Sequence, residues 1–375
     1  MNNEKNDKYK YSPADFKSDQ EVKWCPGCGN HAILTSVVRA LPQVAEALHY
    51  KHERFTFVSG IGCSSRFPYY MNTFGFHGIH GRAPAIATGV KVANPKLSVW
   101  QVTGDGDALA IGGNHFIHAV RRNIDINILL FNNEIYGLTK GQYSPTSKLG
   151  KVTKTSPFGT IEHPFNPGEL VLGARGTFFA RTIDVELNLT QECLVAAAKH
   201  DGTSVVEILQ NCVIFNDKTH ADFALNKEVR EENTITLRHG ERMIFGRNRD
   251  KGLVQIGMKL MVVRIGEGGV TEEDILIHNA HEPNPGVHMM LVNMRYPNYP
   301  VALGVIRDVP DHTYDDNIVD QLEEIRAKSN IHCVDDLLRS GETWESRASR
   351  PAPSAPDCRR RAAPETWPPP SSCGR

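Results

Sequence analysis

The sequence predicts an α/β fold, a parallel sheet with helices on both faces, followed by a C-terminal extension. Short apolar runs alternate with segments whose apolar residues recur at helical spacing. This alternation is typical of βαβ units, which place parallel strands in one sheet. Two polar motifs also follow directly after apolar runs. Open α/β sheets bind ligands at that edge, beyond the carboxyl ends of the strands.

The elements expected in the first half of the chain alternate regularly. The first helix should end at Pro42, which cannot donate a helical hydrogen bond, and the second opens with a proline at Pro84. The strands are aromatic, β-branched or almost continuously apolar. Strands are expected at residues 54–59, 97–102 and 126–131, and helices at residues 29–41, 84–93 and 108–122.

The second half continues the pattern less regularly. Residues 217–290 mix helical and irregular stretches, and residues after 345 are rich in proline, arginine and serine, which predicts disorder. Strands are expected at residues 177–183, 204–210 and 301–309, and helices at residues 190–200 and 317–328. The expected domains are a flexible arm (1–20), an α/β domain (21–216), a C-terminal region packing on it (217–345) and a disordered tail (346–375).

Composition excludes several classes of partner. Of the 375 residues 40% are hydrophobic and 23% charged, and 42 basic against 43 acidic side chains give a net charge of −1. Nucleic acids and anionic membranes call for a basic surplus, which this chain lacks. No apolar run reaches the ~20 residues of a membrane-spanning helix, and the N-terminus has no apolar signal segment. We expect a cytoplasmic protein without nucleic-acid or membrane partners.

Four cysteines indicate metal or redox chemistry. Cys25 and Cys28 lie in the motif WCPGC, and Cys63 and Cys212 each follow an expected strand. A thioredoxin-like dithiol would follow a strand, whereas this pair follows a polar arm. A zinc site and a [4Fe–4S] cluster both take four thiolates, and spacing alone does not separate them. The remaining cysteines of the folded region are interpreted as small hydrophobic side chains: Cys193 and Cys333.

A second motif predicts a magnesium site. Asp105 lies between Gly104 and Gly106 after one expected strand, and Asn133 follows the next strand 28 residues later. Together with the backbone carbonyl of Ile135, these groups supply three hard oxygen ligands, and two diphosphate oxygens and a water would complete an octahedron. The flanking glycines let the backbone approach a diphosphate closely. The alternative is an ordinary tight Gly-Asp turn.

Two loops extend this constellation. His77 and His80 flank a glycine-rich loop that enters a helix, a favourable position for an anion or a cofactor ring, although ordinary turn histidines would look the same. The segment 136–146 follows the second metal strand directly. It carries Lys140, a cation within reach of an acidic substrate, unless that lysine is simply solvated.

The motifs WCPGCG, GIGCSSRFPYY, HGIHGRAPAIATGVK, GDGDALAIGGNHFIHA and NNEIYGLTKGQYSPTS, in this order, resemble the β subunits of 2-oxoacid:ferredoxin oxidoreductases, in particular the 2-oxoglutarate type. The likeness covers about residues 20–220, and the segment after residue 345 departs from it. It implies a thiamine-diphosphate-binding fold with thiamine diphosphate, Mg²⁺ and one [4Fe–4S] cluster. By motif position, the cluster ligands are Cys25, Cys28, Cys63 and Cys212, and the magnesium ligands Asp105, Asn133 and Ile135.

The resemblance also assigns the remaining site residues. Leu138, Thr139 and Lys140 fall where the family contacts the substrate or coenzyme A. The expected cofactor-binding residues are Gly62, Cys63, His77, His80, Gly81, Gly104, Gly106, Asp107, Tyr136, Gly137 and Leu138.

The activity implied is the coenzyme A-dependent oxidative decarboxylation of 2-oxoglutarate to succinyl-CoA and CO₂, with electrons passed to ferredoxin. Thiamine catalysis needs a glutamate against the pyrimidine ring, and the motifs offer none. The family supplies that glutamate from an α subunit, so we expect a heterodimer whose β chain alone is inactive. The alternatives are the same chemistry on pyruvate or another 2-oxoacid, and a non-redox thiamine-dependent decarboxylase or lyase with a structural zinc.

Overall fold

The computed structural model describes residues 9–342 and residue 344. The chain divides into two compact units, residues 1–321 and residues 322–375, and the site lies in the first. The expected tail, residues 346–375, lies outside the described residues. Residues 9–20 differ from the expected flexible arm, because they carry the short helix η2 (Pro13–Phe16) and bury the ring of Phe16.

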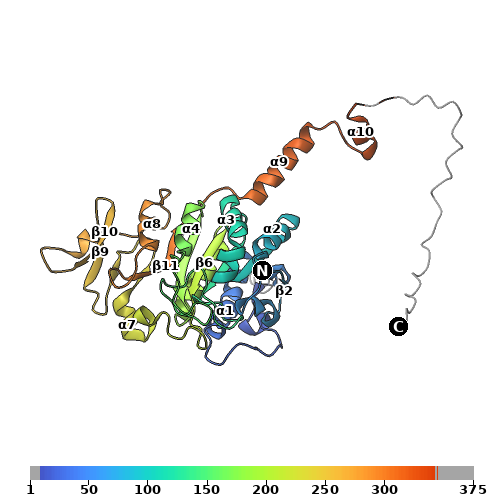
Figure 1. Cartoon of the computed structure of the whole chain (residues 1–375). Helices are drawn as coiled ribbons and strands as arrows, with labels where there is room; N and C mark the ends of the chain where they lie inside the picture. The colour runs from blue at the N-terminus through green and yellow to red at the C-terminus, as the bar shows by residue number, and fades with distance from the viewer. Residues whose placement is uncertain (1–8, 343, 345–375) are drawn as a thin grey trace, which may run out of the picture. The chain divides into compact units, whose positions relative to one another are not determined.

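An eight-stranded sheet forms the centre of the first unit, in the order β2-β1-β3-β4-β6-β5-β11-β7 (Figure 1). Every neighbouring pair is parallel except β11 with β5, so six strands run in one direction, whereas β11 and β7 at one edge run in the other. The predicted parallel sheet is confirmed, with these two antiparallel strands added. The strands are β1 (Phe55–Ser59), β2 (Phe74–His77), β3 (Ser98–Gly104), β4 (Asn127–Asn132), β5 (Phe178–Ile183), β6 (Ser204–Leu209), β7 (Thr234–Leu237) and β11 (Val301–Asp308).

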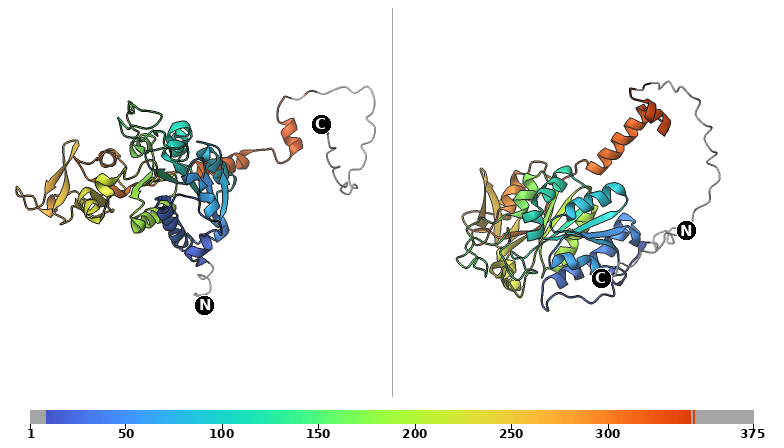
Figure 2. Two further views of the ribbon diagram at one scale, coloured as in Figure 1. Left: turned by 60° about the horizontal axis from the view of Figure 1, so that its bottom comes forward. Right: turned by 45° about the vertical axis from the view of Figure 1, so that its right-hand side comes forward.

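Helices cover both faces of this sheet, as predicted (Figure 2). Apolar side chains from one face pack with α1 (Asn30–Leu48) and α5 (Leu187–Lys199). Those from the other face pack with α2 (Ala83–Ala93), α3 (Gly113–Arg122) and α4 (Pro167–Gly173). The buried strands β3, β4 and β6 are parallel, so their carboxyl ends lie at the same edge of the sheet. The loops at this edge carry the polar motifs.

The helices expected at residues 190–200 and 317–328 each begin three residues earlier in the structure, and two other predicted helices differ more. Helix α1 runs through Pro42 to Leu48, because the apolar side chains on both sides of the proline are buried and offset the lost hydrogen bond. The expected helix 108–122 is divided into a π-helical turn, η5 (Asp107–Ile111), and α3, and the break falls at two consecutive glycines. Single π-helical turns are frequently found at functional sites.

The C-terminal part of the chain contains elements that the sequence pattern did not predict. The strands β8 (Ile244–Phe245), β9 (Lys251–Ile256) and β10 (Lys259–Arg264) form a separate antiparallel sheet. The remaining helices and short helical turns are η3 (His52–Arg54), η4 (Ser64–Tyr70), α6 (Ala221–Ala224), α7 (Lys227–Asn233), η6 (Glu272–Asp274), α8 (Gly286–Val292), α9 (Tyr314–Lys328) and α10 (Val334–Arg339). The described residues include no helix long and apolar enough to cross a membrane.

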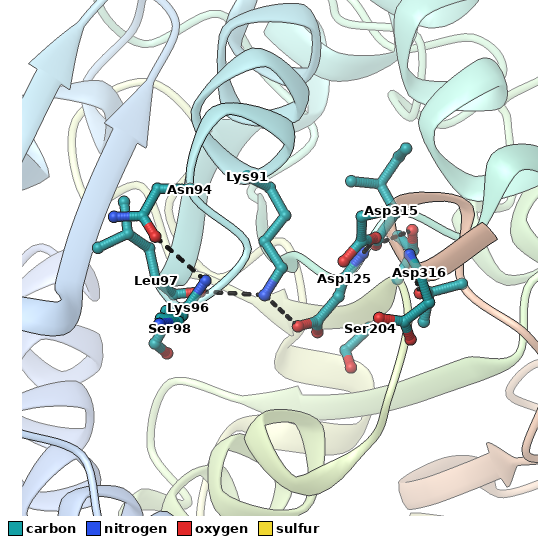
Figure 3. Close-up of polar contacts among 12 residues, drawn as sticks. Lys91, Asn94, Lys96, Leu97, Ser98, Asp125, Ser204, Asp315 and Asp316 are labelled. Carbon is teal, nitrogen blue, oxygen red and sulfur yellow. Dashed lines mark hydrogen bonds and ion pairs between the residues drawn. The ribbon is translucent and has the colours of Figure 1, made fainter. Parts of the chain in front are cut away.

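A buried lysine connects the helical layer to the sheet. The ammonium of Lys91, only 3% exposed, donates to the Leu97 carbonyl at 3.1 Å and forms an ion pair with Asp125 (Figure 3). The carboxylate of Asp315 accepts the backbone N–H of Asp125 at 3.0 Å and holds this loop from the other side.

We expect Lys91→Ala to destabilise the protein by about 2–3 kcal/mol, because it leaves a carbonyl and a partly buried carboxylate without their charged donor. Chemical denaturation would measure the change. The matched control is Lys96→Ala, whose side chain is exposed in the loop before β3 and whose removal should change stability by less than about 0.5 kcal/mol. Equal stability of the two variants would contradict a stabilising role for Lys91.

Candidate active site

A cavity of about 150 Å³ lies at the carboxyl ends of β3 and β4, and we call it the edge cavity. Neighbouring parallel strands end side by side here, so loops far apart in sequence converge. Its lining includes most of the residues that the sequence selected: Gly62, Cys63, His80, Gly104, Asp105, Gly106, Asp107, Asn133, Ile135, Tyr136, Gly137, Leu138 and Thr139.

Asp105 is the buried carboxylate of the edge cavity. It is 2% exposed, and its Oδ2 atom accepts hydrogen bonds from the Ser144 hydroxyl at 2.5 Å and the Thr146 hydroxyl at 2.6 Å. Burial raises the pKa of Asp105 to about 6, an effect that the two hydroxyls partly offset. Among the described residues no cation pairs with this carboxylate, and Oδ1 accepts no side-chain hydrogen bond. A divalent cation at Oδ1 would compensate the buried charge.

Asn133 and Ile135 bring further oxygen atoms to the same cavity. The Asn133 amide donates to the Gln210 side chain at 2.8 Å and accepts the Ile135 N–H at 3.2 Å, which fixes its orientation. Within the described part of the chain, no group donates a hydrogen bond to the Ile135 carbonyl. A carboxylate, an amide oxygen and a free carbonyl are the donors that Mg²⁺ prefers, so this set fits the predicted magnesium site.

Asp107 holds two loops against the sheet edge. Its Oδ1 atom accepts the N–H groups of Ile61 at 3.1 Å and Gly81 at 2.7 Å and lies 2.5 Å from Nδ1 of His80. The Thr103 hydroxyl donates to Oδ2 at 2.7 Å. Asp107 also lines the edge cavity, so its predicted contact with the cofactor stays a prediction, and its hydrogen bonds show that it positions the two loops.

Two residues expected to bind the cofactor lie outside the lining of the edge cavity. His77 is hydrogen-bonded to Ser59 and to the Ser65 carbonyl, and Gly81 reaches the site only through its N–H bond to Asp107. His80 does line the cavity, as does the Tyr136 ring. Cofactor binding by His77 and Gly81 therefore stays a prediction, and the structure places both residues outside the cavity lining.

The loop after Asn133 forms the mouth of the edge cavity. The Tyr136 hydroxyl donates to the Gly106 carbonyl at 3.0 Å, and a Cβ atom at Gly106 would lie 2.2 Å from the Tyr136 ring. Leu138 and Thr139 line the cavity, whereas Lys140 is exposed on the same turn with a φ of 75° and is not part of the lining.

A second cavity of about 240 Å³, the thiol cavity, contains all four predicted cluster ligands: Cys25, Cys28, Cys63 and Cys212. Burial raises the pKa of the Cys28 thiol to about 12, and each of the other three thiols contributes to the rise. Trp24 fixes this region by donating to the Cys63 carbonyl at 2.6 Å. The described residues contain no group of three or more His, Cys, Asp or Glu side chains that could hold a single metal ion.

The two cavities have a common wall. The residues that line both are Asn30, Cys63, Asn133, Gly137 and Leu138. At Gly137 a Cβ atom would lie 3.5 Å from Sγ of Cys212 and 3.7 Å from Sγ of Cys63, so a small residue there keeps the wall thin.

The other two cysteines of the described residues lie elsewhere. Cys193 is 1% exposed inside α5, as the hydrophobic interpretation predicted, whereas Cys333 is exposed at the start of α10. The sequence analysis placed Ser144 and Thr146 in the segment 136–146 but gave them no role, and it did not select Gln210, the last residue of the expected strand 204–210. In the structure these three side chains orient Asp105 and Asn133.

The fold is that of a thiamine-diphosphate enzyme: residues 60–208 match the family described as "Thiamine pyrophosphate enzyme, C-terminal TPP binding domain". The 2-oxoglutarate oxidoreductase subunit KorB of Mycobacterium tuberculosis is 51% identical over 333 residues, 88% of this chain and 87% of that protein. The 2-oxoglutarate synthase subunit KorB of Archaeoglobus fulgidus is 41% identical over 216 residues, 57% of this chain and 79% of that protein.

A solved structure supports the same assignment. The 2-oxoglutarate:ferredoxin oxidoreductase from Magnetococcus marinus, with 2-oxoglutarate, coenzyme A and succinyl-CoA bound, matches with a TM-score of 0.70 and 30% identity. The match covers 89% of this chain and 97% of that chain. The chain belongs to the β subunits of the 2-oxoacid:ferredoxin oxidoreductases, of the 2-oxoglutarate type, and the predicted fold class and family are confirmed.

Proposed function

We propose that this chain, together with an α subunit, catalyses the coenzyme A-dependent oxidative decarboxylation of 2-oxoglutarate to succinyl-CoA and CO₂, with electrons passed through a [4Fe–4S] cluster to ferredoxin. The single observation that carries the proposal is the common wall between the edge cavity and the thiol cavity. An enzyme that decarboxylates and then transfers electrons needs its two cofactors close together, and Cys63 and Gly137 belong to both cavities.

The edge cavity would hold magnesium and thiamine diphosphate. Asp105, Asn133 and the carbonyl of Ile135 would bind the ion, and the glycines beside Asp105 leave room for the diphosphate. Thiamine diphosphate, when bound, supplies the nucleophilic carbon and the electron sink for decarboxylation. The Tyr136 ring lies over Gly106, and the exposed side chains of Leu138 and Thr139 also line the cavity.

The thiol cavity would hold the cluster through Cys25, Cys28, Cys63 and Cys212. Thiols with raised pKa values, such as Cys28, are poor free nucleophiles, but iron binding releases their protons. A structural zinc with non-redox thiamine chemistry is the rival interpretation of the same thiols. Iron and acid-labile sulfide in the anaerobically purified protein would support the cluster, whereas stoichiometric zinc without iron would overturn it.

An α subunit completes the proposed site. No glutamate of the described residues lines the edge cavity. Glu134, beside the metal ligand, instead accepts a hydrogen bond from the Thr219 hydroxyl at 2.8 Å and lines a different cavity. The glutamate that thiamine catalysis requires therefore comes from the partner. Ferredoxin reduction by the reconstituted αβ complex with 2-oxoglutarate and coenzyme A, and none by the β chain alone, is the expected result.

Substrate choice provides a separate prediction. We expect Lys140→Ala to raise KM for 2-oxoglutarate by about ten- to a hundredfold and to leave pyruvate turnover nearly unchanged, because only 2-oxoglutarate carries a second carboxylate for a charge-assisted bond. Lys140 lies on the same turn as Leu138 and Thr139, which line the edge cavity, and its own side chain is exposed outside that lining.

Steady-state kinetics of the αβ complex would measure both constants, with Lys199→Ala on the surface of α5 as the control. A parallel loss with both oxoacids and a raised KM for coenzyme A would assign Lys140 to the coenzyme A site. It would also contradict this explanation of the preference for 2-oxoglutarate over pyruvate.

A further inference from the structure

A continuous line of buried polar contacts leads away from Asp105 across the sheet. The single hydrogen of the Thr146 hydroxyl is shared between two acceptors, Oδ2 of Asp105 at 2.6 Å and Oδ1 of Asn132 at 2.9 Å. The Asn132 amide donates to Oε1 of Glu207 at 2.8 Å, and Nε of Arg181 donates to Oε2 of Glu207 at 2.6 Å. We call these five residues the buried polar chain.

The strand register explains how this chain forms. Arg181 and Glu207 are direct partners across β5 and β6, and Glu207 is the partner of Leu130 across β6 and β4. Because side chains alternate along a strand, Asn132, two residues after Leu130, shares the face of Glu207. Three adjacent strands thus place an arginine, a glutamate and an asparagine in one row, and Thr146 joins the row to Asp105.

The distal end of the buried polar chain is anchored on both sides. Nη2 of Arg181 donates to Oδ1 of Asn166 at 3.2 Å, and Asn166 in turn caps α4 and donates to the Val292 carbonyl at 2.9 Å. Arg181 is 6% exposed and Glu207 2% exposed. A buried ion pair is weak evidence for stability, because desolvation offsets most of the attraction, whereas a fully bonded pair fixes the orientation of its neighbours.

Within the buried polar chain, the orientation of Asp105 matters most, because it decides which carboxylate oxygen faces the proposed cation. Both hydroxyl contacts, from Ser144 and Thr146, fall on Oδ2, which leaves Oδ1 for the proposed cation. Rotation of the carboxylate would place a hydroxyl-bonded oxygen on the metal instead. Holding Thr146 in place therefore selects the oxygen that is presented to the edge cavity.

We propose that the Arg181–Glu207 pair is a positioning pair for the magnesium ligand Asp105, acting through Asn132 and Thr146. The inference rests on the proposed magnesium–diphosphate site. None of the three distal residues, Asn132, Glu207 or Arg181, lines the edge cavity; all three line a separate cavity of about 190 Å³. Neither Glu207 nor Arg181 is adjacent in sequence to a proposed magnesium ligand, so an effect of Glu207→Gln on the cofactor would be transmitted through the buried polar chain.

The test measures cofactor affinity rather than activity. Thiamine diphosphate is titrated by calorimetry, at several Mg²⁺ concentrations, into the αβ complex stripped of cofactor. We expect Glu207→Gln and Thr146→Val each to raise the Kd about tenfold, the loss of roughly one well-formed hydrogen bond. The double variant should be about as weak as either single variant, because both changes interrupt the same line of contacts.

A matched control separates positioning from general weakening of the sheet. Thr182→Val removes a buried hydroxyl, 2.8 Å from the Thr190 hydroxyl, one residue from Arg181 and on the opposite face of β5. It should lower the melting temperature and leave the Kd unchanged.

If Glu207→Gln does not fold, Asn132→Leu is the substitute variant. It interrupts the buried polar chain in its middle and leaves the ion pair intact, and we expect the same loss of affinity.

The outcomes distinguish this inference from the proposed function. Wild-type protein that shows no Mg²⁺-dependent binding of thiamine diphosphate would overturn the proposed site itself. Wild-type binding together with an unchanged Kd in Glu207→Gln, or in Asn132→Leu, would overturn only the positioning role. Strictly additive effects of Glu207→Gln and Thr146→Val would also overturn it, because they would place the two residues on independent routes to the cofactor.

Discussion

Asp105→Ala is expected to abolish Mg²⁺-dependent binding of thiamine diphosphate, with a loss in affinity of about a hundredfold or more, and to leave iron content unchanged. The diphosphate is held mainly through the ion, and Asp105 supplies the only carboxylate of the proposed ligand set. None of the four cluster thiols is within the hydrogen-bond network of Asp105, which consists of the hydroxyls of Ser144 and Thr146 and the N–H of Gly106. Calorimetry and iron analysis on the same preparation would measure both effects.

Asp105→Ala also removes a buried charge, and this changes the stability of the protein in addition to cofactor binding. Because burial raises the pKa of Asp105, the metal-free protein should tolerate the neutral alanine better than the metal-bound protein does. Asp315→Asn is the control, since that carboxylate is equally buried but caps the N–H of Asp125 instead. Unchanged cofactor affinity in Asp105→Ala would remove the magnesium assignment, whatever its effect on melting temperature.

The extent to which sequence predicted this fold depends on how each element is buried. Strands β4 and β6 are buried on both faces, and their mainly apolar sequences were recognised to within a residue or two. Strand β2, FGFH, is an exposed edge strand, and no pattern of burial marks it in the sequence. Helix α1 continues past Pro42 because packing against α5 outweighs a local rule that holds for isolated helices.

The residues of the candidate site also differ in how far the sequence could predict them. The Asp105 and Asn133 motifs are local in sequence, since each is a short string after a strand, and they could be recognised without a structure. The contacts that orient them join residues 39, 41 and 77 positions apart: Ser144 and Thr146 with Asp105, and Gln210 with Asn133. Such pairs depend on strand order and loop path, which composition and periodicity do not determine.

The four cysteines of the thiol cavity should each be required for the cluster, and the other two described cysteines should not. We expect Cys212→Ser and Cys63→Ser to lose most of the bound iron and sulfide, because a serine hydroxyl is a poor replacement for a thiolate on iron. Cys193→Ser is the matched control: the side chain is buried in α5, so the change should cost stability but no iron. Iron and sulfide analysis, with the visible absorption of the anaerobic protein, measures the result.

The comparison between the Cys212→Ser and Cys193→Ser variants is the most informative, because both remove a thiol but at different positions in the fold. Cys212 lies beside Gly137 and Cys63 at the wall between the two cavities, whereas Cys193 faces the apolar core. If Cys193→Ser lost the cluster and Cys212→Ser kept it, the fourth ligand would be misassigned. The proximity of cluster and cofactor inferred from their common wall would then also lose its main support, because it requires that the thiols beside Gly137 are the ones that bind iron.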